Sequence, residues 1–172
     1  ATSGYWPFGF VAASGDVRDT VVHGGGFVHG FTYSHQPGAA AVAREVLRIL
    51  EAESLVEASA VKGERLLALL RARLETHAAV GDIRGLGLLV GVELVRDRAS
   101  KAPYPRAAKL IETVVRISRD RGLLLYSGTG NANGTDGDIV VLGPPFVVTD
   151  EEMVRITDGL GDALDAALAE LD

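Results

Sequence analysis

The stretch from Val80 to Val95 constrains the fold of this 172-residue chain more than any other. Apolar side chains alternate along it with small or polar ones, a pattern typical of a β-strand with one buried face. One face would carry Leu86, Leu88, Val90, Val92 and Leu94, and the other Gly85, Gly87, Leu89, Gly91 and Glu93. Because glycines let another element approach a strand closely, we expect one strand here, packed within a core.

Two more strands are predicted after this run, over 123–126 and 138–143. A loop rich in glycine and asparagine joins them. Between the first strand and these two, an apolar stripe at helical spacing from Ala107 to Ile117 predicts a helix. About three mainly antiparallel strands with helices on one side form an α+β domain.

The last helix has a clear start signal in Thr149 and Glu152, which have the spacing of a capping box. In the first half of the chain, helices are predicted over 39–51 and 55–76 from their apolar stripes. A short strand is expected over 8–13, followed by a turn or short helix.

Net charge argues against some partners. The formal charge is −6 and no apolar run is long enough to span a bilayer, so we expect neither nucleic acid nor a membrane as partner. The chain has no cysteine, which fits a reducing cytoplasm and excludes cysteine-based chemistry.

No metal site is predicted. His23, His29 and His35 recur every six residues, a spacing that matches neither a helix face nor common zinc ligand patterns. The loop over 127–138 is rich in oxygen ligands, but it lacks the final glutamate of a calcium-binding EF-hand. We interpret it as a flexible connection between two strands.

The stretch from His29 to Pro37 has the composition of an anion-binding turn. Thr32 and Ser34 supply hydroxyl groups, and Gly30 lets a ligand approach the main chain. An alanine-rich helix follows Pro37. An ordinary loop-to-helix junction would have the same composition, so the residues alone leave both interpretations open.

The sequence of this stretch resembles that of class III aminotransferases, which are pyridoxal phosphate (PLP) enzymes of fold type I. The matching residues are Gly30-Phe31-Thr32-Tyr33-Ser34, followed by a proline and an alanine-rich helix. In that family the segment crosses a homodimer interface. The resemblance implies that Thr32 binds the phosphate of the partner subunit's cofactor, with Phe31 lining the partner's site.

Two further motifs fall in the family's order. Gly4-Tyr5-Trp6-Pro7 matches the residues that follow the family's Schiff-base lysine. This lysine is therefore expected just before Ala1, and no catalytic residue is expected within the chain itself. Arg84-Gly85-Leu86-Gly87-Leu88 matches the start of the family's small domain. For Arg84 we favour a structural role over contact with substrate. The lysines Lys62, Lys101 and Lys109 are expected on solvated surface.

Substrate contacts are implied for Tyr5, Trp6, Phe31 and Tyr126, although Tyr5 and Trp6 would serve equally well as core residues. Many members carry a carboxylate-clamping arginine where this chain has Tyr126. A tyrosine donates one hydrogen bond and no charge, so carboxylate recognition needs another group or a less carboxylate-dependent substrate.

The resemblance implies a domain plan and a function. Residues 1–36 would end the large α/β cofactor domain and form the interface segment, 37–79 the connecting helices, and 80–172 the small α+β domain. The expected reaction moves an amino group from an amine or amino acid to a 2-oxo acid. A PLP-dependent aminomutase, racemase or decarboxylase, and a non-catalytic dimerisation domain, remain alternatives.

Overall fold

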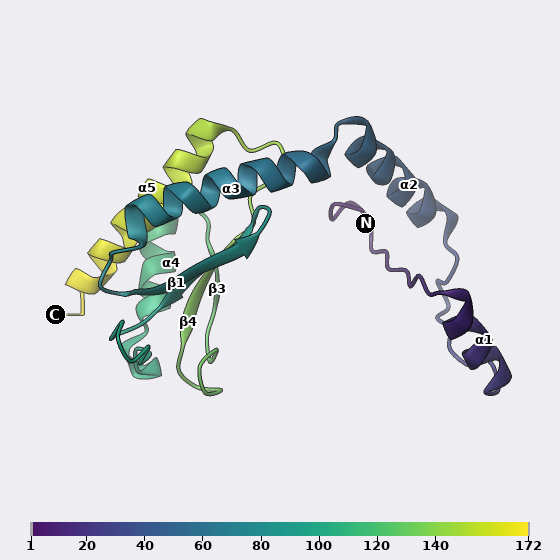
Figure 1. Ribbon diagram of the computed structural model, residues 1–172, viewed down its shortest axis with the longest axis horizontal. Helices are drawn as coiled ribbons and strands as arrows, with labels where there is room; N and C mark the ends of the chain where they lie inside the picture. The colour runs from purple at the N-terminus through teal and green to yellow at the C-terminus, as the bar shows by residue number, and fades with distance from the viewer. Residues whose placement is uncertain (1, 172) are drawn as a thin grey trace. The chain divides into compact units, whose positions relative to one another are not determined.

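The computed structural model describes residues 2–171, and the chain divides into two compact units, Ala1–Leu55 and Val56–Asp172 (Figure 1). The first unit contains helices α1 (Gly15–His23) and α2 (Pro37–Ala52). The second contains α3 (Leu55–Leu74, whose first residue ends the first unit), the sheet, and the last two helices. Helix α3 therefore belongs to the same compact unit as the strands.

Both helices of the first unit begin at a side-chain cap. The Ser14 hydroxyl accepts a hydrogen bond from the Val17 amide at the start of α1. At α2 the Gln36 side chain accepts from the Ala39 amide, and Pro37 occupies the first turn, where its missing N–H costs nothing. The predicted helix over 39–51 is thereby confirmed.

The predicted strand over 8–13 is wrong. These residues belong to no helix and no strand in the part of the chain that the structure describes. β-propensity is not sufficient for a strand, because a strand also needs a neighbour for its main-chain N–H and C=O groups.

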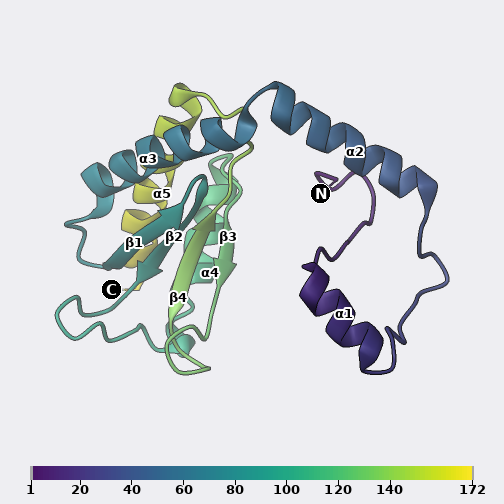
Figure 2. The ribbon, with the colours of Figure 1, turned by 45° about the vertical axis from the view of Figure 1, so that its right-hand side comes forward.

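The second unit is built on one antiparallel sheet with strand order β1-β2-β4-β3 (Figure 2). The strands are β1 (Val80–Leu86), β2 (Leu89–Leu94), β3 (Tyr126–Gly128) and β4 (Asp138–Leu142). All three pairings are antiparallel. The predicted α+β class is confirmed, with four strands in place of about three.

The additional strand arises because the run from Val80 to Val95 is a hairpin and not one strand. Leu86 pairs with Leu89 across a tight turn, in which Gly87 adopts the left-handed φ of +55°. The alternation continues through the turn, so the pattern alone does not reveal it. Leu88, Val90, Val92 and Leu94 are buried as predicted, whereas Leu86 is 90% exposed at the tip.

Three helices, α3, α4 (Leu110–Asp120) and α5 (Asp150–Ala169), pack with the sheet of the second unit. Helices α4 and α5 pack against each other, and α4 also contacts β3 and β4. A short 3-10 turn, η1 (Arg106–Ala108), precedes α4. Apolar residues of α3, α4 and α5 meet the sheet in one core. Its fully buried large side chains include Leu66, Leu70, Leu74, Leu110, Ile111, Met153, Leu160 and Leu164.

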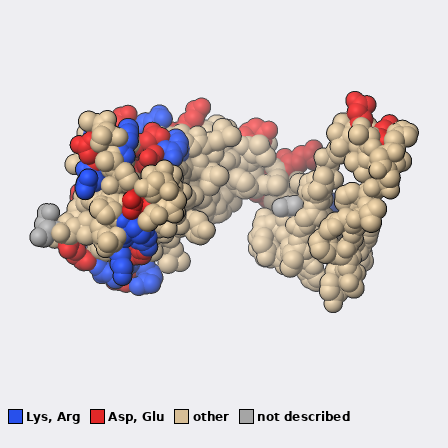
Figure 3. All heavy atoms as spheres, turned by 90° about the horizontal axis from the view of Figure 1, so that it is seen from below, with Lys and Arg blue, Asp and Glu red and all other residues tan. Residues whose placement is uncertain are grey.

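Charged side chains of both signs are interspersed over the face of the second unit seen in Figure 3. Several form ion pairs between elements, such as Arg116 of α4 with Glu170 just after α5. Exposed pairs of this kind contribute little individually to stability, so the apolar core is the main source of the unit's stability.

Candidate functional site

A short turn presents the two residues predicted to face the cofactor. The Phe31 amide donates to the Ser34 hydroxyl at 3.1 Å, and the Ser34 amide donates to the Phe31 carbonyl at 2.9 Å. Next, His35 adopts a left-handed φ of 61°, which turns the chain into α2. Thr32 therefore lies at the head of a turn that is closed by its own hydrogen bonds.

The Thr32 side chain is exposed, and among residues 2–171 its hydroxyl has no hydrogen-bond partner. A hydroxyl group in this state can donate to an anion without breaking an existing bond. The arrangement fits one contact to a phosphate oxygen. Residues 31–34 include no cationic side chain, so the turn by itself supplies neutral hydrogen-bond donors and no charge.

Phe31 belongs to a row of rings along the extended segment before the turn. Its ring meets His29 edge-to-face at 4.7 Å between centroids, and His29 meets Phe27 in the same way at 5.8 Å. Phe31 is nevertheless 73% exposed. The row of rings was not expected, although Phe27, His29 and Phe31 stand at every second position, a spacing that places side chains on one side of an extended segment.

Tyr5 and Trp6 lie on a second turn, at the start of the described residues. The Tyr5 amide donates to the Thr2 carbonyl, and the Thr2 hydroxyl donates to the Trp6 carbonyl at 2.5 Å. Ser3 and Gly4 both have positive φ, as a tight turn of this kind requires. The side chains of Tyr5 and Trp6 are both exposed.

Tyr126, the fifth predicted site residue, is the first residue of β3 in the second unit and is 75% exposed. It lines a hollow of about 350 Å³ at the edge of the sheet, together with Leu124, Pro144, Pro145 and Ile156. None of the residues lining the hollow carries a charge. The surface beside Tyr126 therefore suits an apolar group better than a carboxylate.

Arg84 is held by two carboxylates. Its guanidinium lies 2.7 Å from Asp82 and 2.7 Å from Glu93, which are paired across β1 and β2. The hydrogen bond that Arg84 donates to Glu93, followed by the one it donates to Asp82, raises the pKa of Arg84, and Arg84 in turn lowers the pKa of Asp82. This ion triad favours the structural role that we expect for Arg84.

Two of the three lysines use their amines on main-chain carbonyls. Lys62 of α3 donates to the Phe146 carbonyl at 2.7 Å, and Lys101 donates to the Gly81 carbonyl. Lys109 is exposed at the start of α4, with a left-handed φ of 50°. Lys62 is partly buried and connects α3 to the loop after β4, although it was expected on solvated surface.

The glycine and asparagine loop between β3 and β4 is closed by its own side chains. The Asn133 side-chain oxygen accepts from the Thr135 and Asp136 amides, and the Asp136 carboxylate accepts from the Arg106 amide. Within residues 2–171 no cluster of three or more histidine or acidic side chains is placed to hold a metal ion. The helices of the same range are all too short or too polar to cross a membrane.

Residues 1–164 match the family model of class-III aminotransferases. The taurine–pyruvate aminotransferase of Rhodobacter capsulatus is 40% identical over 76% of this chain and 27% of its own length. The crystal structure of a transaminase from the marine bacterium Virgibacillus matches with a TM-score of 0.89. It is 30% identical, over 99% of this chain and 38% of its own.

An omega transaminase from Pseudomonas jessenii, solved in complex with PMP, is 37% identical over 89% of this chain and 32% of its own, with a TM-score of 0.73. The chain spans about a third of the length of the curated relatives it matches. The family model covers the motifs in the order in which the family carries them, and the antiparallel α+β unit agrees with this match. The chain is therefore a member of the class-III aminotransferases.

Proposed function

We propose that this chain forms part of a PLP-dependent aminotransferase, which transfers an amino group from an amine or amino acid to a 2-oxo acid. The observation that carries the proposal is the free, exposed Thr32 hydroxyl at the head of its turn. Family membership supports the assignment, and a related transaminase was solved with PMP. The predicted cytoplasmic location stays a prediction.

In this proposal Thr32 donates its hydroxyl hydrogen to a phosphate oxygen of the cofactor. Phe31, beside it, presents an apolar ring that excludes water from the neighbouring substrate region. PLP, when bound, supplies an aldehyde for the incoming amino group and a ring that withdraws electrons. We do not assign the role of holding this aldehyde to Lys62, Lys101 or Lys109.

We propose a homodimer as the working form. The first unit has almost no core of its own, since Thr2, Ala39 and Ala43 are its only buried residues within 2–55. Large apolar side chains remain exposed along it, including Phe10, Phe27, Phe31 and Tyr33. Such a surface is costly in water and is typical of chains that are covered by another protein surface. A second copy that takes up the Phe31–Ser34 turn would cover part of it.

Tyr126 sets the expected substrate class. The hollow beside it is uncharged, so we expect it to receive the apolar part of an amine or amino acid. Any carboxylate on the substrate would need a cation from elsewhere in the complete enzyme. Tyr5 and Trp6 are exposed and remain candidates for further substrate contacts.

The direct test measures PLP affinity in the complete protein carrying Thr32→Ala. Loss of one hydrogen bond to a charged phosphate costs about 1.5–3 kcal/mol, so the dissociation constant of PLP should rise at least about tenfold. Thr32→Ser keeps the donor and should bind nearly as well as the parent. Thr20→Ala, in exposed α1, serves as the matched control because the Thr20 hydroxyl donates only to the Asp16 carbonyl of its own helix.

Unchanged PLP affinity in Thr32→Ala would contradict the assigned role. Product analysis with an amine and a 2-oxo acid then distinguishes amino-group transfer from the alternative functions. A racemase or decarboxylase would act on the amino acid without consuming the 2-oxo acid. A dimerisation domain would bind no PLP.

A further inference from the structure

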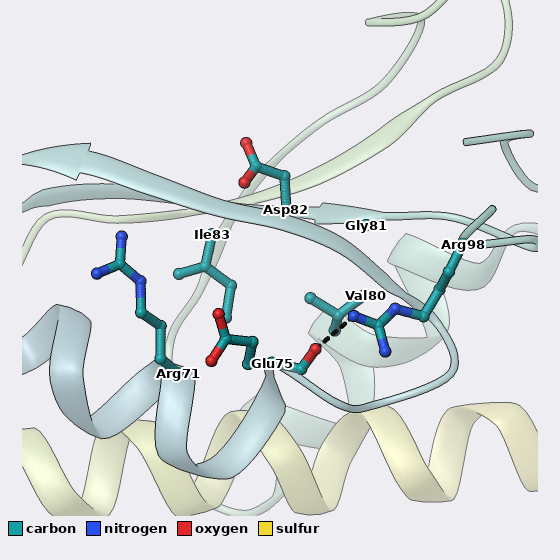
Figure 4. Close-up of a pocket in the computed structure, with 7 residues that line it drawn as sticks. All are labelled: Arg71, Glu75, Val80, Gly81, Asp82, Ile83 and Arg98. Carbon is teal, nitrogen blue, oxygen red and sulfur yellow. Dashed lines mark hydrogen bonds between the residues drawn. The ribbon is translucent and has the colours of Figure 1, made fainter. Parts of the chain in front are cut away.

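A polar pocket lies between the last turns of α3 and the beginning of β1. It has a volume of about 280 Å³, and its lining includes Arg71, Glu75 and Arg98 (Figure 4). Val80 and Ile83, both buried, contribute apolar surface to it. Convergent charged groups of this kind can fix the orientation of a small charged molecule.

Arg71 and Glu75 face this pocket without pairing. Arg71 lies in the last turn of α3 and Glu75 directly follows the helix, yet the two side chains form no ion pair, and within residues 2–171 neither side chain has another partner. Figure 4 shows the Glu75 carboxylate between the Arg71 and Arg98 guanidinium groups. The lining of the pocket therefore includes one cation and one anion that have no partner among residues 2–171.

Arg98 is fixed at the other end of the pocket. Its guanidinium donates to the Glu75 main-chain carbonyl at 2.5 Å. The loop that carries it is itself closed, since the Asp97 carboxylate accepts from the Ser100 amide and hydroxyl. One N–H of the guanidinium is used on the carbonyl, and the remaining donors are available to a ligand.

Asp82 does not neutralise these arginines. Its carboxylate pairs with Arg84 at 2.7 Å and projects from the opposite side of β1 in Figure 4. The groups that face the pocket are therefore two guanidinium groups and one carboxylate. Their complement is a small molecule with one carboxylate and one ammonium group.

We propose that this α3–β1 pocket binds a free α-amino acid. Arg71 and Arg98 hold the ligand carboxylate, Glu75 holds its ammonium group, and the apolar surface of Val80 and Ile83 receives a small side chain. The volume is sufficient for an amino acid of modest size. The proposal rests on the pocket alone and does not depend on transaminase activity.

Two-dimensional ¹H–¹⁵N NMR of the full chain tests it, with glycine or alanine as the added ligand. Because the pocket is open to solvent, we expect a dissociation constant on the order of millimolar. The amide signals of Gly81, Asp82 and Ile83 should shift with saturation. Acetate and methylammonium, which each carry one of the two charges, should bind about tenfold more weakly than glycine.

Substitutions of Arg71 and Glu75 test whether these two side chains contact the ligand. Arg71→Gln and Glu75→Gln should each weaken glycine binding about tenfold. The matched controls Arg65→Gln and Glu64→Gln, on the same helix but absent from the pocket lining, should bind like the parent chain. All four positions are exposed, and unchanged signals elsewhere in the spectrum establish that each variant is folded.

Three results would overturn the proposal. The first is the absence of saturable shifts with any amino acid. The second is a phosphate or acetate response equal to or stronger than that of glycine, with Glu75→Gln binding these anions better, which would identify a simple anion site. The third is an equal loss of glycine binding in the Arg65 control.

Discussion

Gly63 of α3 and Gly87 of the β1–β2 turn meet main chain against main chain. A methyl group placed on Gly63 would lie 2.2 Å from the Gly87 carbonyl oxygen. The turn is fixed from the same helix by Ser59, whose hydroxyl accepts a hydrogen bond from the Leu88 amide. The absence of a side chain at Gly63 thus allows the hairpin tip, with its exposed Leu86 and Leu89, to lie against α3.

Gly63→Ala should destabilise the second unit. The backbone of Gly87 cannot move aside as a flexible side chain could, and overpacking of this kind costs about 1–3 kcal/mol. Urea unfolding followed by circular dichroism measures the change in free energy. Glu64→Ala, at the exposed neighbouring position, should change it by less than about 0.5 kcal/mol. Equal stability of Gly63→Ala and the parent chain would show that the helix and turn separate freely.

Asp165 makes the stability of the second unit depend on pH. It accepts from Arg73 at 2.9 Å and from His77 at 3.0 Å, joining α5 to α3. The His77 ring accepts the Ala79 amide on its other nitrogen, so the nitrogen facing Asp165 carries the hydrogen. Arg73 first, and then His77, lower the pKa of Asp165 below that of an ordinary aspartate.

Because the folded pKa is the lower one, the contribution of Asp165 is complete above pH ~4 and is lost as the pH falls through the folded value. Asp165→Asn should therefore reduce the unfolding free energy near neutral pH, by about 1 kcal/mol or less because the pair is solvent-exposed. The difference in unfolding free energy between Asp165→Asn and the parent chain should disappear in acid. Urea titrations across this range measure it, with Asp158→Asn of the same helix as the control. A gap that stays constant with pH would contradict the assignment.

Tyr126→Arg should change substrate preference in the complete enzyme. A guanidinium placed beside the uncharged hollow adds a bidentate partner for carboxylates. We expect KM for a carboxylate-bearing amino donor to fall about tenfold relative to that for a simple amine. Tyr126→Phe, which removes only the hydroxyl, should leave the ratio of the two near that of the parent. If Tyr126→Arg leaves this ratio of KM values unchanged, Tyr126 does not line the substrate region.

The start of the last helix could be predicted because its signal is local. Thr149 and Glu152 exchange the two hydrogen bonds of a capping box, as their spacing indicated. The turn at Gly87 could not, because apolar residues on both sides continue the alternation of a strand. The third strand begins at Tyr126, three residues later than expected, because pairing with β4 and not apolar content decides where the ladder runs.

The site was predictable only in part, for a related reason. The exposed Thr32 and the uncharged surroundings of Tyr126 agree with what the motifs implied, but their roles in binding stay predictions. The pocket at Arg71 and Arg98 carried no sequence signal. Its members come from a helix, a strand and a loop, and only the tertiary fold brings such residues together.

The hydrogen bonds that shape the segment from Phe31 to Ala39 all span three residues, within the turn and at the Gln36 cap. Shape encoded at so short a range does not depend on the sequence elsewhere in the chain. Distant substitutions accumulated during divergence would leave the presentation of Thr32 intact, and so would grafting this short module onto another scaffold.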